Sequence, residues 1–104
     1  MPEINITKEN FDDEVRNYKG LVLLDFWASW CGPCMMLSPI ISGIGEKYSD
    51  KVKVGKVNVD EQPELAMAFR VESIPLLVVV KDGVIQKTSV GVIPESEILK
   101  MLNL

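Results

Sequence analysis

A near-continuous apolar run, Leu21–Phe26, is typical of a strand that is covered on both of its faces. A strand with one face in water would instead alternate apolar and polar residues. Only Asp25 interrupts the run, and a carboxylate in such a place is costly unless it has a partner or stays protonated. The run therefore predicts the central strand of an α/β fold.

Helical and strand-like segments alternate along the rest of the chain. A short strand over 4–6 precedes a helix that Thr7 can cap and Gly20 ends, and a second helix begins at Cys31 as N-cap and runs to about Tyr48. The later elements are a strand over 52–59, a short helix opened by 60–63, strands over 76–80 and 84–90, and a final helix within 94–104. The order is βαβαβα followed by ββα.

This order predicts a central mixed sheet with helices on both faces. Helices between the early strands imply parallel pairing. Asp82-Gly83 is a strong signal for a two-residue hairpin, which we expect to add antiparallel edge strands. With 104 residues, 47% of them hydrophobic, the chain can bury one core, so we expect a single domain over residues 1–104.

Charge and composition exclude several classes of function. A net charge of −4 and a pI near 4.8 argue against a nucleic-acid surface, which needs clustered Lys and Arg. No apolar run approaches the length of a membrane span, and residues 1–5 lack the features of a signal peptide, so we expect a reducing cytoplasm. The absence of histidine removes Ser-His and Cys-His nucleophile pairs and the commonest metal ligand.

The only two cysteines, Cys31 and Cys34, are three positions apart where a strand gives way to a helix. A thiol at a helix start faces unpartnered N–H groups and the positive end of the helix dipole, which favour the reactive thiolate. A bridge between them would close a loop of four residues and stabilise the fold by only about 2 kcal/mol, against about 3 for a fifteen-residue loop. The pair is therefore better suited to a disulfide that opens and closes than to a staple.

The chain resembles the thioredoxin family over nearly its whole length. The resemblance rests on residues 25–28, the Trp-Cys-Gly-Pro-Cys motif at 30–34, Pro39, and residues 56–60, 73–75, 81–83 and 91. It implies the thioredoxin fold and an oxidoreductase that reduces protein disulfides. Cys31 would attack the substrate disulfide, and Cys34 would resolve the mixed disulfide. It also implies a monomer without a bound cofactor, recycled by a thioredoxin reductase and acting on disulfide-containing client proteins.

The family also assigns roles to groups beside the cysteines. Asp25 would exchange a proton with Cys34, as a buried acid with a raised pKa can do. Lys56 would pair with Asp25. The sequence permits this pairing, because Lys56 is in phase with Val52 and Val54 and can point inward with them.

Two further groups concern redox tuning and docking. Gly32 and Pro33 would help set the redox potential, and a cis bond before Pro75 would expose the Ile74 backbone to an extended substrate. Client proteins would dock on an apolar rim formed by Trp30, Ile74, Gly91 and Val92.

Four positions depart from the common family pattern and touch the docking surface, so they bear on partner choice. Met35 replaces a frequent lysine after the second cysteine, and Leu76 follows the cis proline in place of threonine. Arg70 stands where glycine is common, and Glu72 stands where a basic or neutral residue is frequent.

Two alternatives remain open at this point. A non-catalytic binding or assembly module could use the same apolar rim without turnover. A metal site is the other alternative, but two thiolates supply half of a four-ligand zinc site, and only a dimer could complete it.

Overall fold

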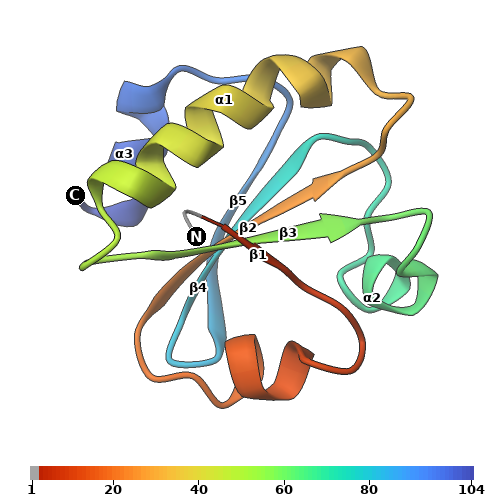
Figure 1. Ribbon diagram of the computed structural model, residues 1–104, viewed down its shortest axis with the longest axis horizontal. Helices are drawn as coiled ribbons and strands as arrows, with labels where there is room; N and C mark the ends of the chain where they lie inside the picture. Colours follow the sequence, from red (N-terminus) through yellow and green to blue (C-terminus); the bar gives the residue numbers. More distant parts are fainter. Residues whose placement is uncertain (1–2) are drawn as a thin grey trace.

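The computed structural model describes residues 3–104 as a five-stranded mixed sheet with helices on both faces (Figure 1). The strands lie side by side in the order β1-β3-β2-β4-β5. The elements are β1 (Ile4–Asn5), η1 (Asp12–Arg16), β2 (Leu21–Trp27), α1 (Gly32–Lys47), β3 (Lys53–Asn58), α2 (Pro63–Ala68), β4 (Leu76–Lys81), β5 (Val84–Val90) and α3 (Glu95–Leu102). The element order and the α/β class predicted from the sequence are confirmed.

Strand β2 lies in the middle of the sheet, as its apolar run predicts. It pairs in parallel with β3 and antiparallel with β4, and β1 also pairs in parallel with β3. The prediction that both hairpin strands are edge strands is wrong for β4. Residues 76–80 are all buried, because five consecutive apolar residues need cover on both faces, and β4 therefore lies between β2 and β5.

The true edge on this side is β5, which buries none of its residues. A two-residue turn joins it to β4, since Lys81 and Val84 are partners in the ladder. Asp82 and Gly83 both have positive φ, 52° and 79°, as the hairpin signal predicts. A Cβ at Gly83 would lie 2.3 Å from the carbonyl oxygen of Arg16, so this position of the turn also requires a residue without a side chain.

Two apolar clusters fill the space on the two faces of the sheet. On one face Leu23 of β2 packs with Leu37 and Ile41 of α1 and with Ile98 of α3. On the other face the residues that alternate with Leu23, including Phe26, pack against η1 and α2. The alternation along β2 thus assigns Asp25, two residues after Leu23, to the face that α1 covers.

The two predicted N-terminal helices differ in outcome. Helix α1 has Cys31 as its N-cap and Tyr48 as its C-cap, in agreement with the prediction. The segment after Thr7 is instead a five-residue π-helix, with the Asn17 N–H donating to the carbonyl of Asp12. Thr7 still caps the turn before it, because its hydroxyl oxygen accepts the Asn10 N–H at 3.3 Å.

Candidate active site

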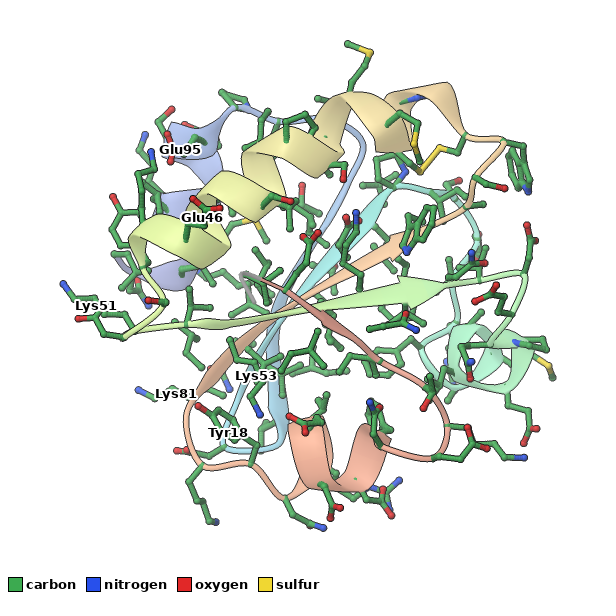
Figure 2. All side chains as sticks on the ribbon, in the orientation of Figure 1. Tyr18, Glu46, Lys51, Lys53, Lys81 and Glu95 are labelled. Atoms are coloured by element: carbon green, nitrogen blue, oxygen red, sulfur yellow. A yellow bond between two sulfur atoms is a disulfide. The ribbon has the colours of Figure 1, made fainter. Side chains whose placement is uncertain are left out.

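The two cysteines are joined in a disulfide at the N-terminus of α1 (Figure 2). Cys31 is in extended conformation as the N-cap, and its Sγ accepts the backbone N–H of Cys34 at 3.2 Å. This N–H group and the helix dipole would stabilise a negative charge on the same sulfur after reduction. The local structure therefore favours a thiolate at Cys31, as its sequence position predicts.

The two sulfurs differ in their access to solvent. Cys31 is 5% exposed and Cys34 only 1%, and both pack with Ala28. Gly32 and Pro33, which lie between them, are exposed, and a Cβ at Gly32 would meet no other atom within 4 Å. An incoming disulfide can thus approach Cys31 across an open surface, whereas Cys34 lies beneath the first turn of α1.

Segments far away in sequence meet the disulfide. The Ile74–Pro75 peptide bond is cis, and the Ile74 carbonyl oxygen lies 3.9 Å from Cys31 Sγ. The Gly91 N–H donates to the Pro75 carbonyl at 2.8 Å, which brings the exposed Val92 to the same end of the sheet. Three members of the predicted apolar rim, Ile74, Gly91 and Val92, therefore belong to one connected surface beside Cys31.

The fourth member of the rim, Trp30, is 70% exposed. Its indole Nε1–H donates to Asp60 Oδ2 at 2.8 Å. Sequence reasoning did not find this contact, because nothing in the pattern of either segment pairs them. Met35 and Met36 are also exposed next to the disulfide, so the apolar surface continues onto the first turns of α1.

Asp25 is fully buried, and neither of its carboxyl oxygens has a hydrogen-bond partner. Lys56 is its neighbour in the β2–β3 ladder, with Nζ 3.6 Å from Oδ2, so the ion pair that the resemblance implies is formed. Burial raises the pKa of Asp25 to about 6, although the Lys56 charge opposes the rise and Glu3 adds to it. The site thus holds a carboxyl group that can take or give a proton near neutral pH.

A residue that sequence reasoning missed completes this group. The Lys56 ammonium donates to Ser38 Oγ at 2.8 Å and lies 5.1 Å from the centre of the Trp27 ring. Ser38 follows Cys34 by four residues and faces the same side of α1. A polar residue at helical spacing among buried ones, between Cys34 and Ile41, is the signal that could have identified it.

Residues 3–104 contain no group of three or more His, Cys, Asp or Glu side chains placed to hold a metal ion. No helix among these residues has the length and apolar character that a membrane crossing requires.

Figure 2 shows that the labelled charged residues Lys51, Lys53 and Lys81 lie at the other end of the molecule from the disulfide. The chemistry that the site offers is disulfide exchange, with the buried Asp25 carboxyl on β2, the strand that precedes the disulfide.

Comparisons with known proteins agree with this geometry. A protein-family model described as Thioredoxin matches residues 2–104. Thioredoxin 1 of Synechococcus elongatus is 44% identical over 98 residues, which are 94% of this chain and 92% of its own. Thioredoxin of Porphyra purpurea is 42% identical over 103 residues, covering 99% and 96%, and thioredoxin of Buchnera aphidicola is 40% identical over 100 residues, covering 96% and 93%. The similarity extends over almost the whole of both chains in each case.

Proposed function

The chain belongs to the thioredoxin family, and from this premise we propose how its redox-active pair is used. The protein is a thiol–disulfide oxidoreductase, with Cys31 and Cys34 as the pair that cycles. Its substrates are disulfides of client proteins, and a thioredoxin reductase returns the electrons. It acts as a cytoplasmic monomer without a bound cofactor.

The first step is attack by Cys31. In the reduced protein its thiolate attacks one sulfur of the client disulfide, the client S–S bond breaks, and the other client sulfur leaves as a thiolate. A mixed disulfide between Cys31 and the client remains. The observation that carries this assignment is the place of Cys31 as the N-cap of α1, where its Sγ accepts the Cys34 N–H and where it is the more exposed of the two cysteines, at 5% against 1%.

The second step is attack by Cys34 on the Cys31 sulfur. This breaks the mixed disulfide, releases the second client thiolate and forms the Cys31–Cys34 disulfide. Cys34 must lose its proton first, and Asp25 accepts it. The support for this role is that the Asp25 carboxyl is buried, has two unpartnered oxygens and has a pKa raised to about 6 by burial. Lys56 limits that rise and keeps the group able to ionise.

The apolar rim holds the client during both steps. An extended client segment would lie along the Ile74 backbone, whose carbonyl oxygen is close to Cys31, while Trp30 and Val92 contact its side chains. Gly32 and Pro33 leave the access to Cys31 free of bulky side chains. Together with Pro75 they set the redox potential of the Cys31–Cys34 pair. The exposure of Gly32 and Pro33 supports the first part of this role.

Cysteine variants test this mechanism with a disulfide-bonded client such as insulin. Cys34→Ser should accumulate a mixed disulfide through Cys31 that is visible on a non-reducing gel, because the resolving thiol is gone. Cys31→Ser should neither reduce the client nor trap it. Full turnover by either variant would contradict the two-thiol mechanism. A double Cys→Ser variant that kept the protein's full function would favour the non-catalytic binding module instead.

A further inference from the structure

The Lys56 ammonium has a closer partner than the acid it is paired with. Its Nζ lies 2.8 Å from Ser38 Oγ, which is a hydrogen-bond distance, and 3.6 Å from Asp25 Oδ2, which is beyond one. Both oxygens of Asp25 are buried and accept no hydrogen bond. The cation therefore acts on the carboxyl group by its charge, while its directed bond goes to the helix.

We propose that Ser38 is a positioning residue for disulfide exchange: its hydroxyl holds the Lys56 ammonium away from Asp25 and leaves the carboxyl oxygens free for the Cys34 proton. The catalytic part of this inference rests on the proposed role of Asp25. The structural part does not, since it follows from which oxygen the Lys56 ammonium binds.

Three elements fix this arrangement. Asp25 and Lys56 are partners in the ladder between β2 and β3, so their backbones cannot move apart without breaking the sheet. Ser38 is on α1, one turn beyond Cys34, and reaches down to the sheet. The Lys56 side chain is only 13% exposed, and its Nζ is 5.1 Å from the centre of the Trp27 ring. With so little access to water, the ammonium depends on protein acceptors.

Few other charges act on the Asp25 carboxyl. From the N-terminal segment Glu3 raises its pKa, and the Glu3 carboxylate is itself tied to α1 by the Ser42 hydroxyl at 2.9 Å. The two cysteines at the start of α1 are joined in the oxidised protein and do not titrate there. Its partner in β4, Leu77, carries no charge. The distance to Lys56 is therefore the variable that a change at Ser38 would alter.

Removing the Ser38 hydroxyl should move the cation onto the acid. In Ser38→Ala the ammonium loses its nearest acceptor, and the closest one left to it is Asp25 Oδ2. A direct, charge-assisted hydrogen bond would then favour the ionised carboxylate and lower the pKa of Asp25. A less basic carboxylate is a poorer proton acceptor, so Cys34 should resolve the mixed disulfide more slowly.

The decisive measurement is an NMR titration of the Asp25 carboxyl carbon in the oxidised protein. We expect its midpoint to move to lower pH in Ser38→Ala and to return in Ser38→Thr, which keeps a hydroxyl at this position. Leu37→Ala is the matched control, because it removes a buried neighbour on the same helix turn and leaves the Lys56 acceptor intact. It should lower the stability without moving the midpoint. An unchanged or higher midpoint in Ser38→Ala would overturn the proposal.

A kinetic measurement separates this proposal from the role of Asp25. In a single turnover with a small aromatic disulfide, the release of the second aromatic thiolate reports the attack by Cys34. Ser38→Ala should slow this release several-fold at neutral pH, while alkylation of Cys31 in the reduced protein keeps its rate. A lower NMR midpoint with an unchanged release rate would uphold the positioning by Ser38 and overturn the proton transfer assigned to Asp25.

Discussion

Trp30 and Asp60 join two loops that are thirty residues apart in the chain: the indole N–H donates to the Asp60 carboxylate at 2.8 Å. One loop precedes α1 and the other follows β3. The bond holds a large, exposed ring in one orientation beside the disulfide, although little packing surrounds it. A docking surface that is fixed before the client arrives loses less conformational entropy on binding.

Asp60→Ala should therefore raise the KM for a protein client several-fold and leave the reaction with a small disulfide unchanged, because only the protein client needs the oriented ring. Steady-state reduction of both substrates would measure this. Asp60→Asn is the matched control, since its amide oxygen can still accept the indole N–H. Equal losses with both substrates would show that the bond supports the disulfide itself and not the docking surface.

The buried carboxyl predicts an unusual pH dependence of stability. Asp25 has a pKa of about 6 in the folded protein and an ordinary value of 3.8, so the folded state binds the proton more tightly. Its contribution to the free energy of unfolding is fully present below the lower value and is lost as the pH rises through the higher one. The difference between these two pKa values corresponds to about 3 kcal/mol of free energy of unfolding.

Asp25→Asn removes this titration. The variant should be more stable than the parent at neutral pH, by up to about 3 kcal/mol, because the raised pKa of Asp25 already includes the opposing attraction of Lys56. The gain should shrink as the pH falls toward the ordinary pKa. Urea unfolding of the oxidised proteins at several pH values would show it, with the exposed Asp50→Asn as a control that changes little. A variant that is less stable at neutral pH would contradict the raised pKa.

The redox potential distinguishes reduction from oxidation of clients. Equilibration of the Cys31–Cys34 pair in dithiothreitol buffers, followed by tryptophan fluorescence and thiol alkylation, should give a midpoint near the reference value for thioredoxins of about −270 mV. A midpoint above about −200 mV would instead suit an isomerase or oxidase. Pro33→His, in the turn between the cysteines, should shift the midpoint if this residue tunes the pair as proposed.

Arg70 predicts a stabilising substitution. Its φ is 54°, in the left-handed region that costs a residue with a Cβ about 1 kcal/mol. Arg70→Gly should raise the free energy of unfolding by up to about 1 kcal/mol, because glycine enters this region without the penalty. Chemical denaturation would measure the gain. The matched control is Glu72→Gly, at a position without positive φ, which should lower stability.

Much of the fold follows from local patterns in the sequence. The apolar run before Phe26, the capping position of Cys31 and the Asp82-Gly83 turn each depend on residues close together in the chain, and each is confirmed. The interior place of β4 could have been predicted from the same principle as β2, because residues 76–80 are as continuously apolar as the central strand. The order of the elements along the chain does not by itself predict that β4 lies inside the sheet.

Contacts between distant side chains are the part that local patterns do not contain. Ser38 binds Lys56, and Trp30 binds Asp60, only because the sheet and α1 bring separate segments together. The π-helical turn at 12–16 likewise has no local pattern to predict it. The roles proposed for Gly32 and Pro33 stay predictions, since geometry alone does not determine a redox potential.

The exposed edge strand divides the sheet into a durable part and a labile part. Strand β5 buries no side chain, so its ladder with β4 can open without uncovering the residues that pack beneath α1. Its backbone amides should exchange with deuterium through small local openings, long before those of β2, which exchange only when the whole molecule unfolds. Strand β2, which carries Asp25, would thus keep its position in the sheet while β5 opens and closes.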